Sequence, residues 1–318
     1  MSKQYLQQNA LLSWYAASKR DLPWRHTKDP WSILLSEILL QQTQVSRGIG
    51  YWHRLTARFP TPQSMATAEV DEVLHLWQGA GYYSRARRLH ALAQTVCLPS
   101  SEGGYDGQMP TTAEELRTLP GVGPYTAAAV ASIAFGEPVA CVDGNIRRVM
   151  ARQTVQTNPS LKQVEAWAAS NLYVEDAGDW NQAMMELGAT TCTPRQPKCE
   201  VCSVASSCKG REEAHRYPEP KKIKRKRLDL TCALNIDSLG RPHLVQREMK
   251  GILAGMWGPP MGEQLDVEGL EYIGEVKHVL SHRDLFVKVW RGSCDVGTEP
   301  SSVAISSLDA KILSLVNE

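Results

Sequence analysis

Two carboxylic residues, far apart in the sequence, have the surroundings that acid–base chemistry requires. Asp143 ends an apolar run and is followed by glycine, and Glu37 lies between apolar residues of a helical pattern. Hydrolysis of a glycosidic bond uses such a pair, because one carboxyl protonates the leaving group while the other stays ionised beside an oxocarbenium-like sugar. Both residues also have structural explanations: Asp143 as the cap of a following helix, and Glu37 as a semi-buried residue bonded within its own helix.

Four of the eight cysteines are concentrated in one short segment, separated by six, two and five residues: Cys192, Cys199, Cys202 and Cys208. In a reducing compartment so dense a group indicates a metal site rather than disulfides. Four thiolates also form a closed zinc site, but zinc sites usually show two separated CxxC pairs. A single CxxC between two outlying cysteines favours a [4Fe–4S] cluster.

A glycine turn between two expected helices could hold a phosphate. Thr112 and Glu115 have the spacing of a capping box, Gly121 and Gly123 reverse the chain, and Pro124 suits the first position of the next helix. Glycines allow close approach, and a helix N-terminus presents unpaired N–H groups, so the turn suits a nucleic-acid phosphate. An ordinary helical hairpin would give the same pattern.

Composition predicts a globular, cytoplasmic protein. At 318 residues, with 42% hydrophobic and 22% charged residues, the chain has room for two or three domains. The polar N-terminus does not resemble a signal peptide, and we expect no membrane partner. Because the net charge is only +1, a nucleic-acid surface must come from local groups of arginine and lysine.

The pattern of apolar residues divides the chain into two domains. Residues 1–210 are helical in pattern throughout, and residues 211–227 are charged, contain prolines and end in a basic run, which predicts a linker. Residues 228–318 predict a mixed α/β domain, with strands at 228–236, 244–247, 272–276 and 285–290 and a helix at 307–316.

Five motifs give residues 10–210 a resemblance to a known family. They are LSEILLQQTQV, HLWQGAGYYSRARRL, LPGVGPYTAAAV, VDGNIRRVMAR and NQAMMELGATTCTPRQPKCEVC. In this order, and with this cysteine spacing, the segment resembles the adenine DNA glycosylases of the MutY type, in the helix-hairpin-helix, iron–sulfur glycosylase superfamily.

The resemblance implies a mainly α-helical glycosylase domain with a [4Fe–4S] cluster loop at 192–208, followed by a smaller α/β Nudix-like domain. It also implies a DNA repair enzyme that flips adenine out of duplex DNA and removes it where it is mispaired with 8-oxoguanine or guanine. We expect a monomer that works at the bacterial nucleoid.

The resemblance implies a role for each residue that matches a motif. Glu37 would protonate adenine N7 and later handle water, and Asp143 would stabilise the sugar cation. The remaining assignments are Tyr125 and Asn145 as orienting groups, Arg20, Trp24, Arg25 and Glu186 as the adenine pocket, Gln42 and Tyr82 beside the lesion guanine, and Gly121 and Gly123 on the phosphate. Without the motif, Tyr82 would be read as core packing.

Tyr125 separates this chain from a related reaction type. In the bifunctional endonuclease III type, a lysine that forms a Schiff base stands two residues after the second hairpin glycine, where this chain has Tyr125. The resemblance therefore implies a monofunctional glycosylase. An endonuclease III-like pyrimidine glycosylase, or a lesion-binding scaffold without catalysis, is less consistent with Tyr125, the second domain and the two carboxylates.

The C-terminal domain departs from the family pattern at two places. The family reads the lesion with Phe-Ser-His, whereas this chain has Leu280, Ser281 and His282, and Gly258-Pro259 replaces more usual residues. Ser281 retains a group that can bond oxidised guanine, although the serine and histidine could simply begin a polar strand. Residues 251–270 do not have the cluster of glutamates that holds magnesium in a Nudix hydrolase, so we expect no nucleotide hydrolysis.

Overall fold

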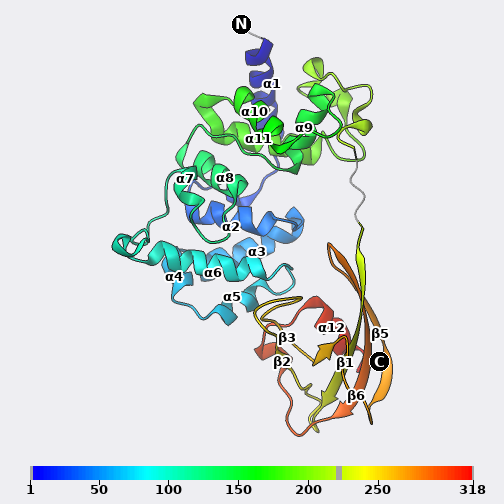
Figure 1. Cartoon of the computed structure of the whole chain (residues 1–318). Helices are drawn as coiled ribbons and strands as arrows, with labels where there is room; N and C mark the ends of the chain where they lie inside the picture. The colour runs from blue at the N-terminus through cyan, green and yellow to red at the C-terminus, as the bar shows by residue number, and fades with distance from the viewer. Residues whose placement is uncertain (1–2, 220–223, 317–318) are drawn as a thin grey trace. The chain divides into compact units, whose positions relative to one another are not determined.

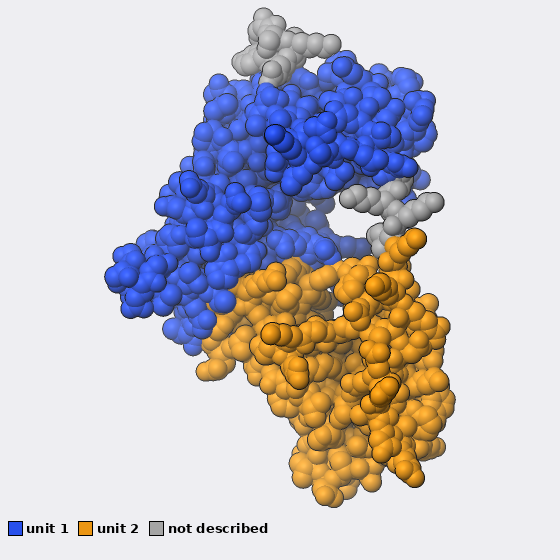
Figure 2. Space-filling model, viewed as in Figure 1, with its two compact units in different colours: residues 1–67, 91–221 blue, residues 68–90, 222–318 orange. Residues whose placement is uncertain are grey.

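The computed structural model describes residues 3–219 and 224–316. The chain forms two compact units, one of residues 1–67 and 91–221 and the other of residues 68–90 and 222–318 (Figure 2). Part of the expected linker, residues 220–223, lies outside the described residues. Over the described ranges, no helix is both long and apolar enough to cross a membrane.

Unit 1 is helical, as the sequence predicts (Figure 1). Three of its longer helices lie near the N-terminus: α1 (Lys3–Ser18), α2 (Pro30–Leu40) and α3 (Val45–Arg58). Four more follow later in the chain: α8 (Pro124–Phe135), α9 (Gly144–Thr154), α10 (Leu161–Asn171) and α11 (Ala177–Thr190). The short α4 (Pro62–Ala66) and α7 (Ala113–Leu116) also belong to it, and α6 (Ser84–Cys97) begins in unit 2 and ends in unit 1.

Helix α2 is the buried centre of the catalytic half. Asp29 caps it by accepting from the Ser32 N–H, and Pro30 occupies its first turn. Eight of its eleven residues are buried, including Glu37. The helix packs against α8, and α11 packs against α1, α8 and α9.

The glycine turn and its flanking helices form as the sequence predicts. Thr112 and Glu115 make a reciprocal capping box at α7, which ends at Leu116. Gly121 has φ +82°, a conformation that L side chains rarely adopt, and Pro124 starts α8.

Unit 2 contains a four-stranded mixed sheet in the order β4-β1-β6-β5. Its strands are β4 (Met261–Gly262), β1 (Lys226–Ile236), β6 (Arg283–Ser293) and β5 (Glu271–Val279). The central pair β1 and β6 is parallel, with Lys226 opposite Arg283, whereas β5 and β6 form an antiparallel hairpin. Strand β1 therefore includes the last two residues of the expected linker.

One face of this sheet carries the core of unit 2. Leu285, Val287 and Val289 alternate along β6 and pack with Leu308 and Ile312 of α12 (Ser307–Ser314). The remaining elements are α5 (Val70–Trp77) and the short pair β2 (Val245–Gln246) and β3 (Trp257–Gly258). Residues 251–270 form turns and short strands, so their acidic residues do not share a helix.

Candidate active site and cysteine loop

One cavity in unit 1 brings together the predicted catalytic and adenine-pocket residues. It has a volume of about 190 Å³, far above the ~10–15 Å³ that a water molecule needs. The expected residues on its wall are Arg20, Trp24, Arg25, Glu37, Tyr125, Asp143, Asn145 and Glu186. Arg20 comes from the segment after α1, Trp24 and Arg25 from the short 3-10 turn Pro23–Arg25, and the others from α2, α8, the start of α9 and α11. Four helices far apart in the sequence therefore build one pocket.

Glu37 is a buried acid whose proton is held near neutral pH. Only 8% of the residue is exposed, and burial raises its pKa to about 7, with a further increase from the Asp143 carboxylate. The hydroxyl of Tyr125 donates to Glu37 Oε2 at 2.7 Å and opposes this increase. Glu37 is thus a proton donor at pH 7 and below, which is what a general acid requires.

Asp143 is both a helix cap and a member of the cavity wall. Its Oδ1 accepts from the Ile146 N–H at 2.7 Å, which caps α9, and its Oδ2 accepts from Asn145 Nδ2 at 2.6 Å. Burial raises its pKa, while these two hydrogen bonds and Arg148 lower it. Asp143 therefore caps α9 as the structural alternative predicts, and the same hydrogen bonds fix its carboxylate in the cavity wall.

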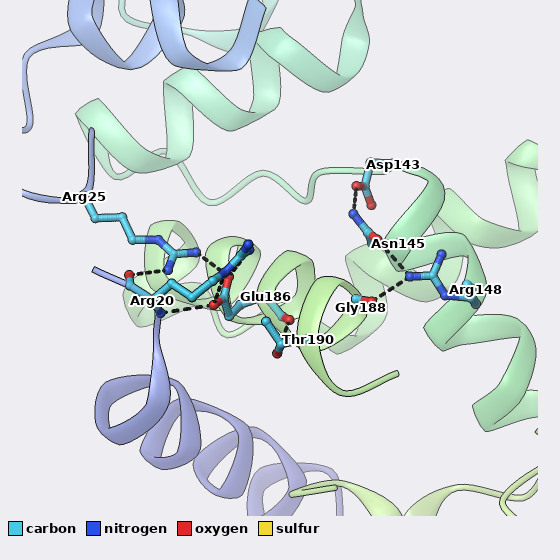
Figure 3. Close-up of polar contacts among 8 residues, drawn as sticks. All are labelled: Arg20, Arg25, Asp143, Asn145, Arg148, Glu186, Gly188 and Thr190. Carbon is cyan, nitrogen blue, oxygen red and sulfur yellow. Dashed lines mark hydrogen bonds and ion pairs between the residues drawn. The ribbon is translucent and has the colours of Figure 1, made fainter. Parts of the chain in front are cut away.

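Glu186 is held by two arginines (Figure 3). Arg20 donates to both of its oxygens at 2.8 and 2.7 Å, and Arg25 donates to Oε2 at 2.8 Å. Burial alone would raise the pKa of Glu186, but these donors outweigh it and hold the pKa at about 2. Glu186 therefore stays ionised and orders the arginines on one side of the cavity, beside Trp24.

Two further residues act on the site through contacts that the sequence did not reveal. Met185 Sδ lies 3.0 Å from the Tyr125 hydroxyl. Arg148 donates to Asn145 Oδ1 at 2.8 Å and to the Gly188 carbonyl at 2.7 Å (Figure 3). It also donates to the Cys192 carbonyl at 2.8 Å. The sequence shows Arg148 within a group of arginines, but its spacing does not predict hydrogen bonds to backbone carbonyls.

The remaining predicted residues lie outside this cavity. Gln42 follows α2, is exposed and has φ +62°. Gly123 caps α8, and a Cβ built on it would meet nothing within 4 Å, so the protein's own packing does not require glycine there. The open space is compatible with close approach of a ligand.

Unit 2 has its own cleft, of about 650 Å³, which contains the other predicted residues. Leu280, Ser281 and His282 form the turn between β5 and β6 and line it together with Tyr82. Ser281 Oγ lies 3.2 Å from His282 Nδ1. Tyr82 has φ +50° and is 44% exposed, so it is not a core residue.

Leu280 has a packing role. It lies against the hydrophobic core of unit 2 while its neighbours Ser281 and His282 are exposed. A leucine can supply this apolar contact, and the serine stays at the tip of the hairpin. The loop from Gly251 to Ala254 completes the cleft, and Arg87 donates a hydrogen bond to the Ala254 carbonyl.

The four predicted metal ligands line a second cavity of unit 1, together with Arg152. None of the four forms a disulfide. Within the described ranges, no three His, Cys, Asp or Glu side chains are arranged to hold a single metal ion. A cubane cluster gives each cysteine its own iron, so its four sulfurs need not converge on one point. The donor set suits such a cluster.

Comparison with known proteins identifies the two parts of unit 1. Residues 35–172 match the HhH-GPD superfamily of base excision DNA repair proteins, and residues 192–208 match the iron–sulfur binding domain of endonuclease III. The second match confirms the prediction of an iron–sulfur loop, whose four cysteines fit a [4Fe–4S] cluster.

Similar proteins are named adenine DNA glycosylase. The human protein is 36% identical over 92% of this chain and 68% of its own length, and the Mycobacterium tuberculosis protein is 43% identical over 60% of this chain and 64% of its own length.

Solved structures share the helical fold. A thermostable thymine-DNA glycosylase has a TM-score of 0.61 and 30% identity, and covers 66% of this chain and 97% of its own. An endonuclease III bound to DNA has a TM-score of 0.57 at 23% identity, covers 68% of this chain and 100% of its own, and so shows the fold alone. The family prediction is confirmed: this chain belongs to the adenine DNA glycosylase family, within the HhH-GPD superfamily of base excision repair proteins.

Proposed function

We propose that this protein removes adenine paired with 8-oxoguanine, or with guanine, from duplex DNA and does not cleave the strand itself. The observation that carries the proposal is the buried Glu37 carboxyl, with its pKa near 7, in the same cavity as Asp143. Adenine must leave the base stack to reach this cavity, at a cost of a few kcal/mol.

Glu37 supplies the proton that makes adenine a leaving group. Its carboxylic O–H protonates N7 of adenine, the bond between N9 and C1′ breaks, and the electron pair of that bond goes to the base. The resulting sugar cation faces the Asp143 carboxylate, which the Ile146 N–H and the Asn145 amide hold in place. Water then adds to C1′, and its proton returns to the Glu37 carboxylate.

The reaction ends at the abasic site because no lysine of residues 3–219 or 224–316 lines the cavity. Tyr125 occupies the position where the bifunctional enzymes have their lysine, and its hydroxyl is committed to Glu37. Among the described residues that line the cavity, none is lysine. Water is therefore the nucleophile that completes the reaction.

Single-turnover excision tests this mechanism. Duplexes with adenine opposite 8-oxoguanine, guanine or cytosine are compared for the wild type, Glu37→Gln and Asp143→Asn. Both variants keep the size of the side chain, and we expect each to lower the rate by about 100-fold or more. Glu165→Gln, at an exposed position of α10, should leave the rate unchanged. Excision that survives both site substitutions would refute the assignment.

Borohydride trapping tests the second half of the proposal. A monofunctional enzyme leaves an intact strand with an abasic site and forms no strong covalent adduct in the presence of borohydride. A strong adduct with the wild-type protein would mean that an amine, rather than water, attacks the sugar.

The cleft of unit 2 is the proposed reader of 8-oxoguanine, and its domain is proposed to be Nudix-like without hydrolase activity. Ser281 Oγ is exposed at the hairpin tip and can bond the oxidised face of the base, while Leu280 fixes the turn to the core. Gln42 and Tyr82, both exposed and both in left-handed conformations, supply side chains that can enter a kinked duplex.

The preference for 8-oxoguanine over guanine opposite adenine tests this cleft. Ser281→Ala should lower that preference by about fivefold or more, since one bond worth ~1 kcal/mol is lost, and should leave excision opposite guanine unchanged. Ser238→Ala, at another exposed serine of unit 2, is the matched control. An unchanged preference would remove Ser281 from the reading site.

A further inference from the structure

Arg152 is a buried cation without an acidic partner. The residue is 2% exposed and lies in the last turn of α9. None of the ion pairs formed by the described residues includes it. An arginine in such a place cannot lose its proton, and taking an uncompensated charge out of water costs several kcal/mol. A compensating negative charge is therefore needed close by.

Backbone oxygens satisfy the hydrogen bonds of this side chain but not its charge. Its donors reach five carbonyls at 2.8–3.1 Å: Cys192, Thr193, Pro194, Ala214 and Tyr217. The first three precede the remaining cysteines of the loop and the last two follow them. The guanidinium thus joins both ends of the cysteine loop.

A sixth contact points to the missing charge. Arg152 Nη1 lies 3.2 Å from Cys192 Sγ, and the guanidinium lines the same cavity as all four cysteines. Four thiolates around a [4Fe–4S] core leave a net charge of about −2, more than enough to balance one guanidinium. The cavity therefore provides an anion for Arg152 only when its cluster is bound.

We propose that Arg152 is the internal counter-cation of the iron–sulfur cluster, positioning Cys192 and favouring the more negatively charged states of the cluster. The proposal concerns the cofactor and does not depend on which base pair the enzyme repairs. Its chemistry is that of a charge-assisted N–H···S bond. The carbonyl cage fixes the guanidinium in place before the cluster binds.

Reduction potentials of the purified holoprotein test the charge. Arg152→Gln removes the cation, so we expect the cluster potential to shift to more negative values, because the reduced state carries the larger negative charge. Arg152→Lys keeps the charge and should stay closer to the wild type. Arg195→Gln removes an exposed cation from the same loop and should cause no shift. An unchanged potential in Arg152→Gln, or equal shifts in both Arg152 variants, overturns the proposal.

If Arg152→Gln binds too little cluster for its potential to be measured, the stability of the bound cluster gives a second test. Iron and sulfide per protein, and the rate of cluster loss to a chelator followed by visible absorption, are measured for the same variants. We expect loss to be about tenfold faster in Arg152→Gln than in wild type, with Arg152→Lys in between. If lysine is as harmful as glutamine, the side chain acts only as a tether and the counter-cation role is wrong.

A thermodynamic cycle gives an independent result. In the wild type, removal of the cluster leaves the buried guanidinium without a neighbouring anion, whereas Arg152→Gln has no such charge. The melting temperature of the wild type should therefore fall further on cluster removal than that of Arg152→Gln. Equal decreases in both proteins would mean that cluster and guanidinium are not coupled, which would contradict the proposal.

Discussion

At the scale of single residues, the site depends on hydrogen bonds that set the state of each carboxyl. Glu37, Asp143 and Glu186 line one cavity, yet the pKa of Glu37 is near 7 and that of Glu186 near 2. Burial acts on both, but only Glu186 is paired with arginines. Their environments therefore place an acid, Glu37, and a carboxylate that stays ionised, Glu186, in the same cavity.

Tyr125→Phe tests how the acid is tuned. The hydroxyl of Tyr125 stabilises ionised Glu37, so its loss should raise the pKa of Glu37 and move the alkaline decline in excision rate to higher pH by roughly one pH unit. Single-turnover rates between about pH 5 and pH 9 measure this decline. Tyr105→Phe, which loses surface hydrogen bonds to Thr118 and to the Glu115 carbonyl, is the control. A decline at the wild-type pH would show that the hydroxyl does not tune Glu37.

The same buried acid makes stability depend on pH. Because the folded-state pKa of Glu37 is about 7 against 4.5 for an ordinary glutamate, its contribution is fully present below pH 4.5 and is lost as pH rises through 7. Glu37→Gln does not titrate, so its free energy of unfolding should exceed that of the wild type by an amount that grows to about 3 kcal/mol above pH 7.

Chemical unfolding at about pH 5 and pH 8 measures this difference. The exposed Glu165→Gln should show the same small effect at both values. If the advantage of Glu37→Gln is no larger at pH 8 than at pH 5, the carboxyl is not held protonated by burial.

At the scale of elements, close packing of α9 and α11 places the carboxylate of Asp143. Gly188 of α11 faces Asn145 of α9, and a Cβ on Gly188 would lie 2.4 Å from the Asn145 Cβ. Arg148 closes the same contact by bonding both residues. The glycine is thus needed for approach between helices rather than for a turn.

Gly188→Ala should push Asn145 away and reduce excision by about tenfold or more, while destabilising unit 1 by roughly 1–3 kcal/mol. Gly50→Ala is the matched control, since its new Cβ in α3 would meet only the Arg54 side chain at 3.9 Å. That change should stabilise the helix by ~0.5–1 kcal/mol. Equal rates for the two variants would mean that the α9–α11 contact does not position the site.

The sequence predicts those features of the helices and strands that depend on neighbouring residues. Pro124 and Asp143 sit at helix starts, where the N-terminal chemistry is local, and both begin helices as expected. The parallel pairing of β1 with β6 and the strands β3 and β4 were not predicted, because they depend on partners far away in the chain. The contacts of Met185 with Tyr125, and of Arg148 with the Gly188 and Cys192 carbonyls, were missed for the same reason.

At the scale of the whole molecule, the segment that carries Tyr82 belongs to unit 2. Residues 68–90 cluster with residues 222–318, so the chain passes between the units at 67/68, inside α6 and near the expected linker. Tyr83 and Arg87 bond the carbonyls of Ile305 and Ala254 within unit 2. The cleft proposed to read the lesion is therefore lined by residues from two distant parts of the sequence.

Arg87→Met should weaken the proposed lesion-reading cleft by removing support from one of its loops. Without its bond to Ala254 the loop of the cleft loses support, and the preference for 8-oxoguanine over guanine should fall by about threefold or more. Arg88→Met removes the same charge from the exposed neighbouring position and serves as the control. A loss of preference that is equal in the two variants would indicate a general charge effect, and salt dependence of binding would reveal it.

The inclusion of residues 68–90 in unit 2 also limits how relatives can be recombined. A chimera that exchanges only residues 228–318 at the linker would keep Tyr83 and Arg87 of this chain but replace the segment that supplies their carbonyl partners. Their two hydrogen bonds could then be lost. Extending the exchange to residues 68–90 keeps those contacts, but one crossover then cuts helix α6. Breakpoints before Val70 and after Cys97, at the ends of complete helices, are the ones at which modules of this enzyme should be interchangeable.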